Sequence, residues 1–158
     1  MKHGKRGLSS SFLTWLPGLA ILLGASIYLF VRPAEPFVFR LGRRLGLDSL
    51  MRLVRPDEPL IKAALPDFLV YSVPNALWAF AYALVIVRIW SPVRHWTGYF
   101  WLSTIPLLVL GFEILQFPGI LPGTFSYPDL FWGILGSAGG ILLGIKSRKH
   151  TSYESEFN

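Results

Sequence analysis

The sequence predicts an all-α, polytopic membrane protein with four transmembrane helices and an interfacial helical segment between the first and the second. Three observations support this fold class. The 158 residues are 53% hydrophobic and only 15% charged, and their mean hydropathy is +0.49. Four runs are nearly free of charge, and each is close to the roughly 20 residues that cross a hydrocarbon core of about 30 Å. A backbone in lipid must satisfy its own hydrogen bonds, so these runs are expected to be helices.

The first run spans roughly residues 12–31, after a basic segment and before Arg32-Pro33. A secretory signal peptide would have a shorter apolar core and a cleavage site of small residues. Here the bulky residues 27–30 follow the small ones. We therefore expect a retained membrane anchor.

Residues 33–65 mix basic and acidic side chains with apolar ones. At about 100° per residue, apolar residues fall on one side and arginines on the other until Gly46, after which the pattern rotates. The apolar residues of the first part are Val38, Leu41 and Leu45, and its arginines are Arg40, Arg43 and Arg44. This pattern predicts two short interfacial helices with a break near Gly46. An irregular extramembrane loop is the alternative.

The other three spans are predicted at roughly residues 68–87, 98–117 and 127–145. Pro17, Pro74 and Pro106 lie inside spans, and each removes one helix donor that neighbouring helices can compensate. We expect residues 1–150 to form a single four-helix bundle and residues 151–158 to form a disordered tail.

Small residues repeat at every fourth position of the last span. They are Gly136, Gly140 and Gly144, with Gly133 and Ser137 beside them. Such spacing lets another helix approach closely. Packing within the bundle is favoured over a dimer interface, although the sequence leaves a homo-oligomer open.

The composition also bounds the chemistry and the partners. The chain has no cysteine, which excludes thiol catalysis, disulfides and cysteine-ligated metals. Its histidines lie in tails or a loop, so we expect neither a metal site nor a cofactor. The net charge of +6 comes largely from residues that flank spans, where they orient helices and meet anionic lipid headgroups. The expected partners are therefore membrane lipids and not nucleic acid.

Four spans place both termini on one side of the membrane. The basic residues of that side are dense and lie directly at span ends, which favours cytoplasmic termini. Several polar residues then gather near the outward-facing end of the spans. They are Asp67, Asn75, Glu113, Gln116 and Asp129.

Glu113 is the strongest functional candidate among these residues. It lies near the C-terminal end of its helix, where a negative charge is disfavoured, and Gln116 shares its face. Asp129 has a structural alternative, because Ser126 and Asp129 fit a capping box that starts the last span. Asp67 likewise begins a helix, and Asn75 is more readily explained by a hydrogen bond between helices than by a ligand contact.

The arrangement Glu113-x-x-Gln116, a short Pro/Gly loop, Asp129 and a Gly-rich span resembles the VanZ-like family of small bacterial membrane proteins. The resemblance covers residues 66–144 and is strongest over 112–144. Of an earlier family motif only Tyr82 matches, and the family's loop arginine is absent. The resemblance implies the bacterial inner (cytoplasmic) membrane and a cell-envelope role, because the family's namesake is associated with low-level teicoplanin resistance.

Together these features predict a membrane protein that binds a lipid-linked or glycopeptide ligand. The predicted ligand-binding residues are Asn75, Tyr82, Glu113, Gln116 and Asp129. A less favoured alternative is an enzyme acting on a lipid headgroup, with Glu113 and Asp129 as acid and base. Against it, the sequence has no nucleophile–base pair or phosphate-binding motif. A proton- or ion-coupled transporter subunit is a further alternative and would require oligomers.

Overall fold

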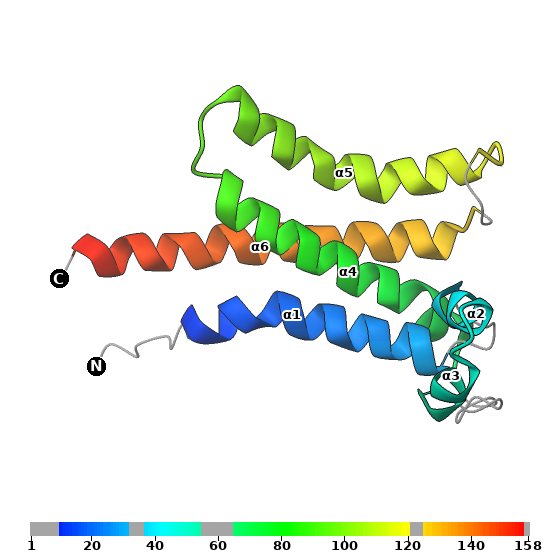
Figure 1. The fold of residues 1–158 in the computed structure, drawn as a ribbon. Helices are drawn as coiled ribbons and strands as arrows, with labels where there is room; N and C mark the ends of the chain where they lie inside the picture. Colours follow the sequence, from blue (N-terminus) through cyan, green and yellow to red (C-terminus); the bar gives the residue numbers. More distant parts are fainter. Residues whose placement is uncertain (1–9, 32–36, 55–64, 121–124, 157–158) are drawn as a thin grey trace.

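The computed structural model describes residues 10–31, 37–54, 65–120 and 125–156, and every regular element in these ranges is helical. The elements are α1 (Ser10–Ser26) with a π-helical turn (Ile27–Val31), α2 (Phe37–Arg44), α3 (Asp48–Val54), α4 (Asp67–Trp90), α5 (Trp96–Gln116) and α6 (Tyr127–Glu156). The predicted all-α fold class is confirmed. Figure 1 shows the four long helices running side by side, with α2 and α3 at one end of the bundle.

Four stretches are long and apolar enough to span a membrane, and they match the predicted spans to within one helical turn. They are Phe12–Val31, Asp67–Trp90, Trp96–Gln116 and Tyr127–Ser147. The C-terminal end differs from expectation. Helix α6 continues to Glu156, so residues 151–156 are helical rather than part of a disordered tail. Neither proline nor glycine follows Gly144, so no residue there interrupts the helix.

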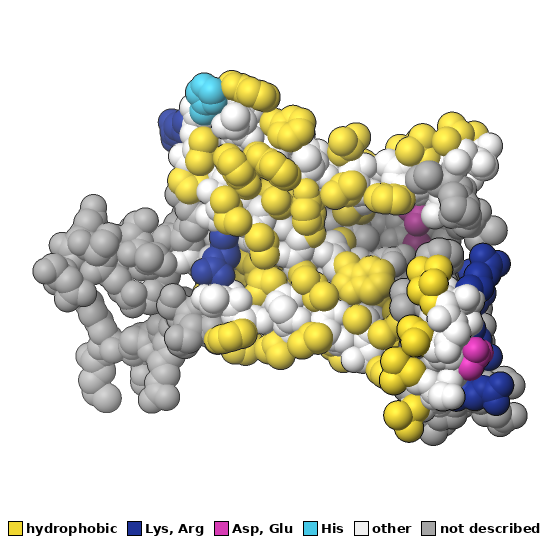
Figure 2. Space-filling model, viewed as in Figure 1, with side chains coloured by type: hydrophobic (Ala, Val, Ile, Leu, Met, Phe, Trp, Pro, Cys, Tyr) yellow, Lys and Arg dark blue, Asp and Glu magenta, His cyan; other side chains and the backbone are white. Residues whose placement is uncertain are grey.

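The segment between α1 and α4 contains the two predicted short helices, and they are separated at Gly46. This glycine has φ +78°, a left-handed conformation that suits a residue without a side chain. Leu45 and Leu53 are 69% and 81% exposed. Figure 2 shows hydrophobic side chains of this segment toward the bundle and basic ones on its outer side, as expected for interfacial helices. The irregular-loop alternative is wrong here. Three basic residues at or near the ends of this segment, Arg32, Arg55 and Lys62, lie outside the described residues.

Helix α4 is the centre of the bundle, because it packs against α1, α5 and α6. Its closest approach is to the glycines of α6. A Cβ atom added at Gly136 or Gly140 would collide with the carbonyl oxygen of Ala76 or Phe80, respectively. One added at Gly144 would lie 2.8 Å from a Val87 side-chain atom. The small-residue stripe is therefore used inside the chain, which confirms the intramolecular interpretation.

Helix α1 is joined to α4 by a hydrogen bond that compensates for a proline. Pro17 has no N–H, so it cannot donate to the carbonyl oxygen of Leu13 four residues earlier. The guanidinium Nη1 of Arg88, in the last turn of α4, donates to this oxygen at 2.7 Å. A neighbouring helix thus satisfies a backbone group that lipid would leave unpaired.

Helix α5 packs against α4 and α6, and within the described helices it makes no contact with α1. It is connected to α4 at one end of the bundle and to α6 at the other (Figure 1). The α5–α6 connection lies at the same end as α2 and α3. The space bounded by α4, α5 and α6 is where the predicted polar residues meet.

Candidate functional site

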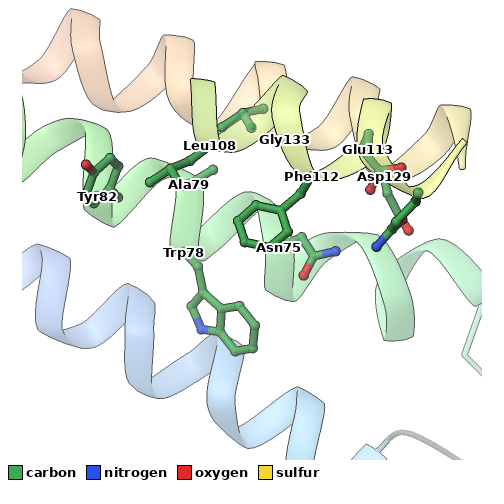
Figure 3. Close-up of a pocket in the computed structure, with 11 residues that line it drawn as sticks. Asn75, Trp78, Ala79, Tyr82, Leu108, Phe112, Glu113, Asp129 and Gly133 are labelled. Carbon is green, nitrogen blue, oxygen red and sulfur yellow. The ribbon is translucent and has the colours of Figure 1, made fainter. Parts of the chain in front are cut away.

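Helices α4, α5 and α6 enclose a cleft of about 430 Å³ (Figure 3). Each helix contributes side chains from a single face, because the lining positions follow helical spacing. The lining residues are Asn75, Trp78, Ala79 and Tyr82 of α4, Leu108, Val109, Phe112, Glu113 and Gln116 of α5, and Asp129 and Gly133 of α6. The cleft therefore has a polar end near the α5–α6 connection and an apolar end nearer the middle of the bundle.

All five residues predicted to bind a ligand line this one cleft. Asn75 and Tyr82 come from α4, Glu113 and Gln116 from α5, and Asp129 from α6. Asp67 does not line the cleft. It is exposed in the first turn of α4, as expected for an acidic residue that begins a helix. The structure thus brings together residues up to 54 positions apart in the chain, from Asn75 to Asp129.

Glu113 is only 8% exposed, and it connects α5 to the start of α6. Its Oε2 atom accepts a hydrogen bond from the backbone N–H of Ser126 at 3.1 Å. Ser126 immediately precedes α6, where backbone donors lack partners within the helix. Glu113 therefore has a structural role that the sequence did not reveal. Gln116 shares this face of α5, but in the described structure it forms no hydrogen bond with Glu113.

Asp129 connects the start of α6 to α4. Its Oδ1 atom accepts a hydrogen bond from the Ser72 hydroxyl at 2.5 Å, and Ser72 is 2% exposed. The backbone N–H of Asp129 donates to Ser126 Oγ at 3.4 Å, so Ser126 caps α6 as predicted. The other half of the predicted capping box is wrong, because the Ser126 amide donates to Glu113 rather than to Asp129. This leaves the Asp129 carboxylate available to Ser72 and to the cleft.

The polar end retains hydrogen-bonding capacity after these contacts. Glu113 and Asp129 each use one carboxylate oxygen in the bonds above, and their side chains lie close together in Figure 3. Within the described residues, the side-chain amides of Asn75 and Gln116 form no hydrogen bond. A ligand at this end would therefore meet carboxylate oxygens and two amides that can still form hydrogen bonds.

Aromatic side chains shape the apolar part of the cleft. The Tyr82 hydroxyl is hydrogen-bonded to Thr104 Oγ1 at 2.6 Å, which joins α4 to α5. Trp78 lies toward α1, where its Nε1 donates to the Ile21 carbonyl oxygen at 3.4 Å. Gly24 makes room for this indole, because a Cβ atom there would lie 2.7 Å from Nε1.

Sequence reasoning missed several lining residues that helical spacing could have found. Trp78 and Ala79 follow Asn75 by three and four positions, on the same helix face as the predicted Tyr82. Gly133 likewise follows Asp129 by four. The role of Ser72 had no comparable signal, because a lone serine inside an apolar span has many structural explanations.

Within the described part of the chain, no group of three His, Asp or Glu residues could hold a metal ion. The fold and the cleft define a helical membrane protein with a partly polar cleft between three of its helices. Comparisons with protein-family models, curated proteins and solved structures found no match to this chain.

The structural role of Glu113 gives a testable result. Glu113→Ala should speed hydrogen exchange at the Ser126 amide about five- to tenfold, because losing one hydrogen bond costs about 1 kcal/mol. Glu113→Gln keeps a carbonyl oxygen and should leave exchange nearly unchanged. Hydrogen exchange of the protein in detergent micelles measures both. Gln116→Ala, which also alters the cleft lining, is the control; equal exchange in the two Glu113 variants would contradict the assignment.

Proposed function

We propose that the protein is a cell-envelope membrane protein that binds an amphiphilic, lipid-linked ligand in the cleft. The observation that carries this proposal is the change of lining along the cleft. Glu113, Gln116 and Asp129 lie at one end, whereas Leu108 and Phe112 continue toward the middle of the bundle. A ligand with a polar head and an apolar chain matches both ends of such a site.

The position of the cleft supports access from the bilayer. Because α5 and α1 do not pack closely against each other in the described structure, the cleft is not closed off by a helix pair on that face. Figure 2 shows acidic side chains in a recess bordered by hydrophobic ones, near the end of the bundle where α2 and α3 lie. A lipid-linked ligand could therefore enter sideways from the membrane, with its head near the interface.

The resemblance to VanZ-like proteins belongs to this proposal, since its residues Glu113, Gln116 and Asp129 all lie at the polar end of the cleft. It extends the proposal to the bacterial inner membrane and to a role in teicoplanin susceptibility. With cytoplasmic termini, the polar end faces outward, where a ligand at the outer leaflet would meet it.

Filling the cleft tests the proposal. Ala79→Phe should reduce the lipid that co-purifies with the protein at least about tenfold, which corresponds to about 1.4 kcal/mol of binding energy. Ala138→Phe is the matched control, because Ala138 is exposed on α6 and does not line the cleft. Mass spectrometry of extracted lipid gives the comparison.

Equal lipid retention by the two variants would refute binding in the cleft. The same pair, expressed at equal membrane levels, tests the link to glycopeptides. Ala79→Phe should change teicoplanin susceptibility and Ala138→Phe should not. Equal susceptibility would refute the link to teicoplanin and to the VanZ-like family. Ligand binding in the cleft would still be tested by the lipid measurement.

A further inference from the structure

We infer that the polar end of the cleft holds a primary ammonium group of the ligand rather than a phosphate. This inference rests on the proposed function and adds the chemical class of the head that the cleft receives. An ammonium group can come from an aminophospholipid headgroup or from another amphiphilic amine, and the two sources share the same charge and the same N–H donors.

The charge of the lining favours a cation. Glu113 and Asp129 are the acidic lining residues, and no lysine, arginine or histidine is among the described residues that line the cleft. A phosphate there would lie beside carboxylates without a positive partner, in surroundings of low dielectric constant where repulsion is strong. An ammonium group reverses the sign of this interaction.

The start of α6 does not offer an anion site either. Helix N-termini attract phosphate through backbone N–H groups that lack partners. Here the Ser126 N–H donates to Glu113 and the Asp129 N–H donates to Ser126 Oγ. Pro128 has no N–H to offer. Three of the four positions 126–129 therefore have no free N–H for a phosphate.

The hydrogen-bonding capacity of the polar end also favours a donor-rich ligand. Glu113 Oε2 and Asp129 Oδ1 have protein partners, so the second oxygen of each carboxylate remains to accept a bond. The amide oxygens of Asn75 and Gln116 add two more acceptors without partners in the described structure. An ammonium group has three N–H donors, so it can bond to both free carboxylate oxygens and to an amide oxygen at once.

A quaternary ammonium provides a sharp comparison. It has the same charge but no N–H, so it can use the electrostatic attraction without the hydrogen bonds. Phosphatidylethanolamine and phosphatidylcholine with identical acyl chains differ in this respect, and phosphatidylglycerol replaces the cation with hydroxyl groups. Native mass spectrometry of the full chain can measure the affinity for each of the three lipids.

The wild-type protein should bind phosphatidylethanolamine at least about tenfold more tightly than the other two lipids, the effect of one charge-assisted hydrogen bond. Glu113→Gln and Asp129→Asn should reduce this preference to less than about threefold. Both variants keep an oxygen for Ser126 or Ser72, and unchanged resistance to unfolding by dodecyl sulfate would show that the bundle is intact. Asp67→Asn is the control, since it removes a charge at the start of α4 outside the cleft.

Octylamine, which has no phosphate, distinguishes an aminophospholipid from another amphiphilic amine as the source of the ammonium group. If octylamine binds in a Glu113-dependent manner but phosphatidylethanolamine is not preferred, the ammonium comes from an amphiphile other than a phospholipid. If neither binds preferentially while Ala79→Phe still releases lipid, the ammonium inference is refuted and binding in the cleft stands. If Ala79→Phe releases nothing, the proposed function itself is refuted.

Discussion

Replacing Gly136 and Gly140 together by alanine is expected to leave the folded bundle about 2–6 kcal/mol less stable than replacing two uncrowded helical glycines. Each new Cβ atom would collide with a backbone carbonyl oxygen of α4, at Ala76 and at Phe80. Overpacking a tight contact costs about 1–3 kcal/mol per site, and backbone atoms cannot rotate away as a side chain can. Because α4 is the centre of the bundle, separating it from α6 should also widen the cleft.

Gly18→Ala with Gly111→Ala is the matched control for this double substitution. Both glycines are helical, and an added Cβ atom at either would meet nothing within 4 Å. Since alanine favours helix over glycine by about 1 kcal/mol, the control should be as stable as the wild type or more stable. Unfolding in detergent micelles by added dodecyl sulfate measures the difference. Equal stability of the two double variants would contradict the close packing of α4 on α6.

The fold could be predicted because its determinants are local in the sequence. Span positions depend on continuous runs of apolar residues, and lipid restricts each run to a helix. The break at Gly46 was visible as a rotation of the apolar pattern, and its positive φ requires a residue such as glycine. The length of α6 was underestimated, because low hydropathy after Lys146 marks the end of a span and not the end of a helix.

The sequence indicated which polar residues lie in the cleft, but not which hydrogen bonds they form. Polar residues in an apolar chain stand out singly, and those near the same membrane face are expected to meet. Which hydrogen-bond donor each carboxylate oxygen meets depends on how the helices are rotated relative to each other. Glu113 therefore caps the Ser126 amide and Asp129 reaches Ser72, pairings that no spacing in the sequence indicates.

The sequence also does not indicate which residue compensates for a proline inside a span. The sequence shows that Pro17 leaves a carbonyl without its helical donor, but not which residue replaces that donor. Arg88 is 75 residues away from Leu13, and as the basic residue at the end of a span it was expected to face the interface. The structure gives this cation a second role, because it holds α1 against α4.

Arg88→Met is therefore expected to destabilise the protein by about 1.5–3 kcal/mol, the value of a hydrogen bond from a charged group. The substitution keeps much of the side-chain length but removes the donor to the Leu13 carbonyl oxygen. Arg94→Met is the control. It removes the same charge from an exposed residue of the α4–α5 connection and should change stability by less than about 0.5 kcal/mol.

Pro17→Ala separates the hydrogen bond from other effects of Arg88. An alanine at position 17 supplies the missing helical N–H, so the Leu13 carbonyl oxygen no longer depends on α4. In this background Arg88→Met should cost at least about 1 kcal/mol less than in the wild type, a coupling within the range of contacting residues. Dodecyl sulfate unfolding of the four proteins in the cycle gives this coupling. Equal costs in both backgrounds would mean that Arg88 stabilises the bundle through its charge at the interface and not through the carbonyl that Pro17 leaves without a donor.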